Sequence, residues 1–178
     1  MELFELAKAE LLRSNTDHRH PFRYFSLATF GLFPEVRTVV AREVSQSLSV
    51  LFFTDSRTPK VAQIKENPRV SALFYHPKKK LQARIKGMAE LIGKGHEAYP
   101  SLLERVKNSD ALKDYTAVLA PGSKVKDTLD VIYGDSLHFM AIRINPLQMD
   151  VLQLGKGQHQ RRGYTWEEGE WAEAILVP

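Results

Sequence analysis

Short runs of β-branched and aromatic residues follow one another along most of this chain, and they limit its fold more than any other feature. Polar links and Gly/Pro turns separate the runs. Residues 81–91 alternate apolar and polar side chains, as a strand with one buried face does. The runs predict a mainly β fold, a mostly antiparallel barrel with peripheral helices. They cover 22–30, 36–43, 47–54, 69–76, 81–91, 137–145 and 147–154, and 159–166 and 170–177 close the chain.

Helical periodicity appears in a few segments between and before the strands. The stretch 59–67 is expected to be a short helix, because Pro59 at its first position loses no needed donor and Thr58 can accept from the free amides. Asn67-Pro68 stops it. The other expected helices cover 2–14, 95–107 and 124–133.

The length of 178 residues suits one domain with a sizeable core, so we expect a single domain over 1–178. Its N-terminal helix, within residues 1–15, is expected to pack outside the barrel. Zero cysteines exclude disulfides, thiolate metal sites and a cysteine nucleophile. The acidic start and the absence of any apolar stretch of membrane-spanning length predict a cytoplasmic protein without a membrane partner.

The net charge of +4 is mild, but basic residues cluster at 78–80 and again around 156–162. Such clusters are solvated loops, nucleic-acid patches or walls of a site for an anion. A hairpin turn explains 78–80 best, and nucleic acid has no further support. His18 and His20 form the only close histidine pair, which we expect in a solvated loop rather than at a metal. No dinucleotide fingerprint, P-loop or nucleophile elbow is present.

The stretch FFTDSRTPKVAQI, residues 52–64, runs from a buried strand into the short helix. One interpretation is an ordinary capped helix whose lysines are solvent-exposed. The other interpretation is a phosphate-binding site, because a helix N-terminus with hydroxyls and two cations, Arg57 and Lys60, favours the binding of an anion.

Four segments taken in order resemble the pyridoxamine 5'-phosphate oxidase family of FMN-binding split barrels. The form T-D-x-R-[ST]-x-K, residues 54–60, is similar to an oxidase-related subgroup. The resemblance implies a split β-barrel homodimer with FMN at the dimer interface and a small-molecule substrate. The four segments are RTVVAR (37–42), FFTDSRTPK (52–60), NPRVSALFYHPKKKLQARIKG (67–87) and WAEAILVP (171–178).

The family's functional positions map onto this chain one by one. Arg37 and Lys60 match the two cations that bind the flavin phosphate, and Arg57 stands in for a family arginine that is Pro59 here. Arg42 and His159 match residues that contact the ring or the substrate. Arg37 and Gln82 are also readable as solvated side chains. The positions that the resemblance assigns to the cofactor are Arg37, Thr38, Val39, Arg42, Phe53, Thr54, Arg57, Lys60, Gln82 and Arg161.

Three departures from the family pattern bear on activity. Leu152 stands where the family has a tryptophan, and Gly157 and Ile175 stand where it has arginines. Loose matches to the residues that hold the substrate phosphate are Tyr99, Arg105, Tyr115 and Ser123. The sequence therefore leaves two hypotheses. One is an FMN-dependent oxidoreductase that takes a hydride from a small amine or alcohol, phosphorylated or not. The other is a non-catalytic split barrel that binds flavin or another cofactor.

Overall fold

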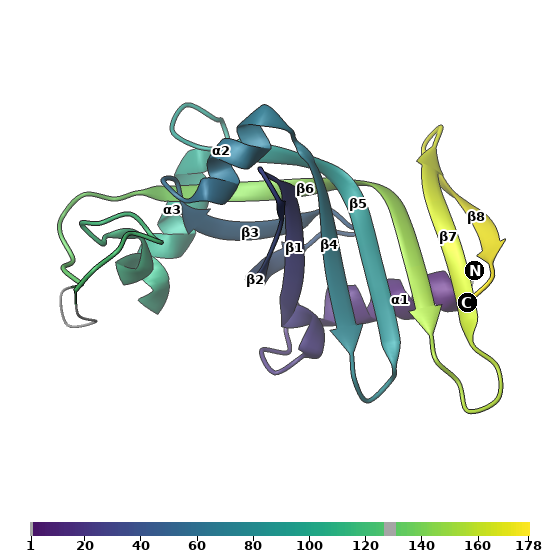
Figure 1. Ribbon diagram of the computed structural model, residues 1–178. Coiled ribbons are helices and arrows are strands. Elements are labelled where there is room, and N and C mark those ends of the chain that lie inside the picture. The colour runs from purple at the N-terminus through teal and green to yellow at the C-terminus, as the bar shows by residue number, and fades with distance from the viewer. Residues whose placement is uncertain (1, 127–130) are drawn as a thin grey trace.

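The computed structural model describes residues 2–126 and 131–178, and its centre is a closed antiparallel barrel, which confirms the expected fold class (Figure 1). Six strands in the order β3-β2-β1-β4-β5-β6 form the barrel, and pairing of β3 with β6 closes it. The strands are β1 (Tyr24–Phe30), β2 (Pro34–Val44), β3 (Val50–Asp55), β4 (Arg69–His76), β5 (Leu81–Ile92) and β6 (Phe139–Gln153).

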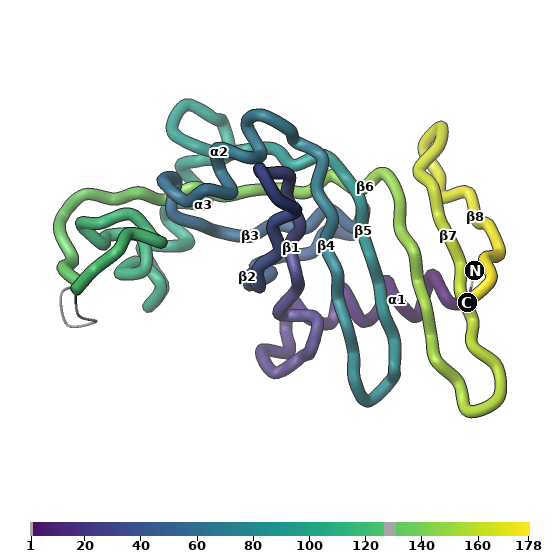
Figure 2. Tube along the Cα trace, viewed as in Figure 1, coloured from purple at the N-terminus to yellow at the C-terminus, as the bar shows by residue number. Residues whose placement is uncertain are grey.

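Strand β6 belongs to two structures at once, as its path in Figure 2 shows. Its first half pairs with β3, whereas its second half pairs with β7 (Gln160–Glu167), which continues into β8 (Glu170–Leu176). We call β7 and β8 the flap. The sequence predicted two runs around Pro146, and the structure joins them into one strand.

Gly87 permits the change of direction in β6. The register between β5 and β6 shifts at Lys86/Gly87, opposite Pro146. A Cβ atom on Gly87 would collide with the backbone carbonyl of Asn145, so this close approach needs a glycine.

We expect Gly87→Ala to destabilise the protein by about 1–3 kcal/mol, because the collision is with backbone that has to move. Thermal unfolding measures this as a fall of roughly 2–4 °C per kcal/mol. Gly157→Ala is the matched control, since nothing lies within 4 Å of its added Cβ. Equal melting temperatures for the two variants would contradict the role given to Gly87.

The helices pack against the barrel and the flap. Helix α1 (Glu2–Arg13) buries Leu3, Phe4, Ala7 and Leu11 in the main core, and the Phe4 ring lies 5.0 Å from that of Tyr164 on β7. Helix α2 (Pro59–Glu66) packs against β1 and β5 at one end of the barrel. Outside β3 and β6, a second apolar cluster lies under α3 (Tyr99–Lys107) and the 3-10 helix η2 (Asp110–Tyr115). A further 3-10 turn, η1, covers Pro21–Arg23.

Two helix predictions need correction. The third helix begins at Tyr99 rather than residue 95. The helix expected over 124–133 falls partly on 127–130, which lie outside the described residues. On either side, 124–126 and 131–133 are not helical, and Tyr133 instead bridges to Ala117. No helix in the described ranges is long and apolar enough to cross a membrane.

Glu10 on α1 is a buried carboxylate that ties the helix to the β4–β5 hairpin. Its Oε2 lies 3.0 Å from His20 Nε2 and 3.5 Å from His76 Nε2, while Lys79 donates to Oε1 at 2.6 Å. His20 is only 3% exposed, so the prediction of a solvated histidine pair is wrong for this residue. Residues 78–80 form the expected hairpin turn, but Lys79 also has a buried partner.

The cluster Glu10–His20–His76 has the residue types of a metal site. Its hydrogen bonds argue otherwise. Nδ1 of His20 accepts from the Phe22 amide, and Nδ1 of His76 accepts from the Lys79 amide. Each ring therefore carries its proton on Nε2; His20 donates it to Glu10, and His76 Nε2 lies 3.5 Å from the same carboxylate. A histidine that binds a metal through Nε2 needs that nitrogen unprotonated and donates from Nδ1 instead.

We expect the free energy of unfolding to fall as the pH drops from about 7 to 5. Burial lowers the pKa of His76 below the ordinary 6.5, so the unfolded chain takes up this proton first and stability is lost through that window. Burial alone would raise the pKa of Glu10, but hydrogen bonds from Lys79 and His20 lower it, so its contribution is lost below about pH 4.5.

Urea unfolding at several pH values measures this dependence. His76→Gln removes the titrating group and should flatten the profile between pH 7 and 5. A variant as pH-dependent as the wild type would contradict the assignment to His76.

Candidate functional site

Two cations, Arg37 from β2 and Lys60 from α2, lie next to each other at the end of the barrel that α2 covers. We call Arg37, Lys60 and their neighbour Thr54 the cationic end. Strand β2 and the β3–α2 turn bring these residues together from positions 37, 54 and 60. The structure therefore groups three of the sequence-predicted cofactor residues.

Arg37 is held by two residues that the sequence did not single out. Its Nη1 donates to the Thr29 hydroxyl at 2.5 Å, and Nη2 donates to Gln63 Oε1 at 3.2 Å. The Thr29 hydroxyl also donates to Gln63 Oε1 at 2.6 Å. Glu35, at 3.7 Å, is the carboxylate beside Arg37, and its side chain is about half exposed. Thr29 ends a β-rich run and Gln63 lies on a short helix, so neither stands out in the sequence.

Lys60 has no ion-pair partner among the described residues. Its Nζ donates to the Thr54 hydroxyl at 3.0 Å. Burial, and then the positive charge of Arg37, lower the pKa of Lys60, and the opposing effect of Asp55 does not offset them. The cationic end thus carries positive charge that its own carboxylates leave largely uncompensated. An anion is the ligand that such a site favours.

The turn before α2 differs in one respect from the sequence prediction. Pro59 is the first helical residue as expected, but the Thr58 side chain makes no cap hydrogen bond and instead donates to the Asp55 carbonyl at 2.9 Å. The Thr58 side chain therefore caps no amide of α2, although the Thr58 carbonyl accepts from the Val61 amide at 3.0 Å.

Arg57 points away from the cationic end. It forms an ion pair with Asp55 at 2.7 Å, and it donates to the carbonyls of residues 117–119. Because these partners engage the guanidinium, the structure does not bring Arg57 together with Arg37 and Lys60. Its observed contacts anchor the 117–119 segment to the β3–α2 turn.

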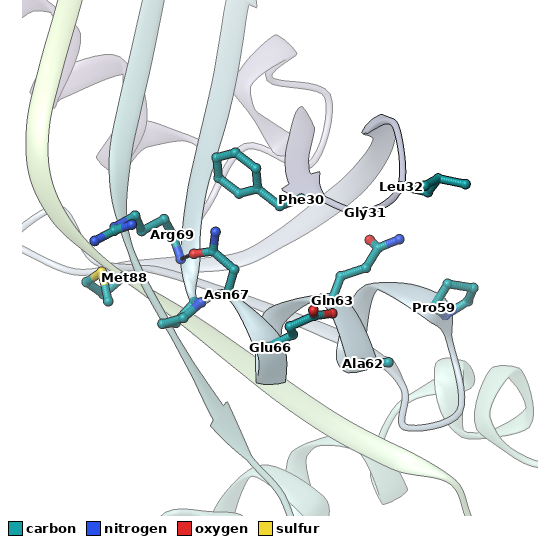
Figure 3. Close-up of a pocket in the computed structure, with 11 residues that line it drawn as sticks. Phe30, Gly31, Leu32, Pro59, Ala62, Gln63, Glu66, Asn67, Arg69 and Met88 are labelled. Carbon is teal, nitrogen blue, oxygen red and sulfur yellow. Dashed lines mark hydrogen bonds between the residues drawn. The ribbon is translucent and has the colours of Figure 1, made fainter.

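A groove of about 980 Å³ adjoins the cationic end, and Figure 3 shows the residues that line it. Gln63, the partner of Arg37, faces the turn between β1 and β2. A Cβ atom on Gly31 would lie 2.9 Å from the Gln63 amide nitrogen, so the turn and helix approach closely. The lining residues are Phe30, Gly31, Leu32, Pro59, Ala62, Gln63, Glu66, Asn67, Pro68, Arg69 and Met88.

On the outer side of β3, Arg42 and Arg105 both lie over the ring of Phe53, with their Cζ atoms 5.7 and 5.9 Å from its centroid. Arg105 pairs with Glu43 at 2.7 Å. Arg42 has a buried Nε without a hydrogen-bond partner. We call Arg42, Arg105 and Phe53 the arginine–aromatic patch. The sequence offered Arg105 only as a loose match to a substrate-phosphate residue. Its place beside β3 depends on the packing of helix α3, which has no local signal in the sequence.

Tyr99 and Tyr115 lie beside this patch, and both pack against Phe139. Burial raises the pKa of Tyr115, and the adjacent charge of Arg42 opposes that shift. The Tyr99 hydroxyl is buried without a hydrogen-bond partner.

Gln82 and Arg161 lie in one row across the outer face of β5, β6 and β7, with Leu152 between them. The cationic end lies instead where α2 covers the barrel, between β2 and the β3–α2 turn. His159 is exposed in the loop before β7. On β2, Thr38 is exposed, whereas Val39 packs against the main core. One chain thus distributes the predicted cofactor residues over separate faces.

Comparison with known proteins gives matches over the barrel and beyond. The family model described as "Pyridoxamine 5'-phosphate oxidase, FMN-binding domain" matches residues 5–93, half of the chain. A pyridoxine/pyridoxamine 5'-phosphate oxidase from Aliarcobacter butzleri is 28% identical over 169 residues, 86% of this chain and 79% of the relative. One from Psychrobacter sp. is 39% identical over 77 residues, 42% of this chain and 35% of the relative.

Solved structures share the fold. A pyridoxamine 5'-phosphate oxidase-related, FMN binding protein from Nostoc punctiforme has a TM-score of 0.78 at 24% identity, covering 98% of this chain and 97% of its own. PhzG from Burkholderia lata, in complex with tetrahydrophenazine-1-carboxylic acid, has a TM-score of 0.74 at 20% identity, covering 98% and 92%. A heme binding protein from Mycobacterium smegmatis has a TM-score of 0.52 at 14% identity, covering 86% and 55%. Because the family model matches half of its length, the chain belongs to the family of pyridoxamine 5'-phosphate oxidase FMN-binding domains.

Proposed function

We propose that this chain is an FMN-dependent oxidoreductase that takes a hydride from a small amine or alcohol substrate. The observation that carries the proposal is the cationic end, where Lys60 has no carboxylate partner among the described residues and Arg37 lies beside it. FMN is the cofactor that the matched family domain is named for.

The residues of the cationic end fit a phosphate monoester. Such a phosphate carries about two negative charges, and an arginine fork with a lysine point charge is a usual way to bind it. Arg37 is already oriented by Thr29 and Gln63, so little side-chain freedom is lost when an anion binds.

The arginine–aromatic patch suits an anionic substrate. Arg42 and Arg105 present positive charge over Phe53, and Arg42 has an unused buried donor. FMN, when bound, supplies the hydride acceptor. The contribution of the chain is to bind and orient, so these residues would hold the substrate's anionic group.

We also propose a homodimer in which a second copy completes the site. The sheet face that carries Gln82 and Arg161 exposes large apolar side chains, among them Tyr24 at 57% and Tyr75 at 49%. Exposed apolar area of this kind is typical of an interface. Pairing two copies through this face would bring residues from separate faces of one chain into a shared site.

The alternative is a split barrel that binds flavin or another cofactor without turnover. It is favoured by Leu152, Gly157 and Ile175, which replace a tryptophan and two arginines of the family pattern. A neighbour of the same fold is named as heme binding. Anaerobic addition of pyridoxamine 5'-phosphate separates the two: bleaching of the flavin band supports the oxidoreductase, and an unchanged band with this and related amines supports the alternative.

We expect Lys60→Gln to weaken FMN binding about ten- to a hundredfold, because a charge-assisted phosphate contact contributes about 1.5–3 kcal/mol. Quenching of flavin fluorescence during titration of the cofactor-free protein measures the dissociation constant. Melting temperatures taken in parallel show whether the variant remains folded.

Lys65→Gln is the matched control, since Lys65 is an exposed lysine on the same helix. It removes the same charge one turn away and should leave the affinity within about twofold. Equal affinities for Lys60→Gln and the wild type would contradict the phosphate role of the cationic end.

We expect Arg42→Met to raise the KM of a phosphorylated amine substrate by about tenfold or more, and that of its unphosphorylated form much less. The methionine keeps apolar contact with Phe53 but removes the charge. Steady-state kinetics with both substrates measure the difference, and Lys107→Gln on the surface of α3 is the control. An equal change for both substrates would show that Arg42 does not bind the anionic group.

A further inference from the structure

Asp150, on the flap half of β6, is the meeting point of two arginines on the outer face of the sheet. Its Oδ2 accepts from Arg84 Nη2 and from Arg161 Nη2, each at 2.7 Å, and its Oδ1 accepts from Arg161 Nε at 3.1 Å. The carboxylate is 13% exposed, so water competes little for these bonds.

The strand register creates this arrangement. Asp150 pairs with Arg84 on one side and with Gly163 on the other, while Arg161 is diagonal to it, opposite Leu152. An added Cβ on Gly163 would lie 3.1 Å from Leu176 Cδ1, so this position has little room for a side chain. The Arg161 side chain reaches from β7 to the carboxylate on β6, which it meets with one edge of its guanidinium.

The other edge of the guanidinium stays available. Nε and Nη2 of Arg161 face Asp150, and Nη1 makes no hydrogen bond within the described part of the chain. Two guanidinium groups share one carboxylate, so the group keeps a net positive charge. Arg161 thus presents a fixed, charged donor in the row that contains Leu152 and Gln82.

Fixing an arginine in advance matters for binding. A free arginine side chain loses rotamer entropy when it is immobilised, and a side chain that is already held avoids most of that loss. Burial alone would raise the pKa of Asp150, but the bonds from Arg161 lower it, and Arg84 adds to this. The carboxylate therefore stays ionised at neutral pH and holds its partners.

We propose that Asp150 is the positioning residue for Arg161, and that it orients this guanidinium for the bound cofactor while Arg84 holds the carboxylate from the far side. The inference rests on the proposed binding of FMN and on the proposed homodimer, because Arg161 and the cationic end lie on separate faces of one chain. Asp150 itself need not touch the cofactor, because it acts through Arg161.

The test is a double-mutant cycle on FMN affinity in the full chain. Asp150→Asn keeps the size of the side chain but replaces one acceptor oxygen by a donor, and we expect it to raise the dissociation constant about tenfold. Arg161→Ala should weaken binding at least as much. Adding Asp150→Asn to Arg161→Ala should change the affinity less than twofold, because the residue that Asp150 positions is then absent.

A purely structural role would give a different result. Asp150→Asn would then weaken binding equally in both backgrounds, in step with a lower melting temperature, and this would overturn the proposal. Asp150→Glu keeps the charge and should restore part of the affinity. It also provides a second reading if Asp150→Asn folds poorly, since full loss of affinity in a stable Asp150→Glu variant would overturn the proposal too.

Glu90→Gln is the matched control. Glu90 lies on β5 opposite Arg143 of β6, and its carboxylate pairs with Arg143 and His96, away from the row of Gln82 and Arg161. It should leave FMN affinity unchanged. If the wild type itself fails to bind FMN, the proposed function is overturned. If the wild type binds and Arg161→Ala weakens binding while Asp150→Asn does not, only this inference fails.

Discussion

The bend in β6 is the constraint on which the rest of the structure depends. Gly87 allows the backbone of β5 to pass close to Asn145 and Pro146, and β6 changes partners at that point from β3 to β7. The half that pairs with β3 closes the barrel and fixes Phe53 and Thr54 on opposite sides of one strand. The half that pairs with β7 builds the flap and places Asp150 beside Arg161. A straight β6 would not support both arrangements.

Buried charges in this protein have two opposite kinds of surroundings. At Glu10 and at Asp150, one shielded carboxylate is surrounded by several donors, and the resulting pKa is lowered even though burial opposes it. At the cationic end the balance is reversed, because Lys60 and Arg37 lie together and Lys60 loses proton affinity. A partly buried lysine with a lowered pKa costs stability at neutral pH. Groups that destabilise the folded protein in this way are typical of functional sites, where a bound ligand supplies the opposite charge.

The same logic separates a binding cluster from a structural one. Glu10, His20 and His76 have metal-ligand residue types, yet backbone amides already occupy Nδ1 of both imidazoles, so each ring keeps its proton on Nε2 beside the carboxylate. The cluster is therefore complete as a hydrogen-bonded joint between α1 and the β4–β5 hairpin. At the cationic end, by contrast, Lys60 has no ion-pair partner among the described residues. Residue type alone does not distinguish the two, whereas the direction of each hydrogen bond does.

The sequence by itself determined the mainly β fold, most strand positions, the first helix and the order of the family-like segments, because periodicity and turn residues act locally. Tertiary structure decided what depends on distant partners. It buried His20 against Glu10, turned Arg57 toward Asp55 and residues 117–119, and left Thr58 bonded to a carbonyl rather than to the helix amides. It also brought Thr29 and Gln63 to Arg37, and Asp150 to Arg161. These residues have no local signal, since a side chain that positions another is defined only by the register and packing that place the two together.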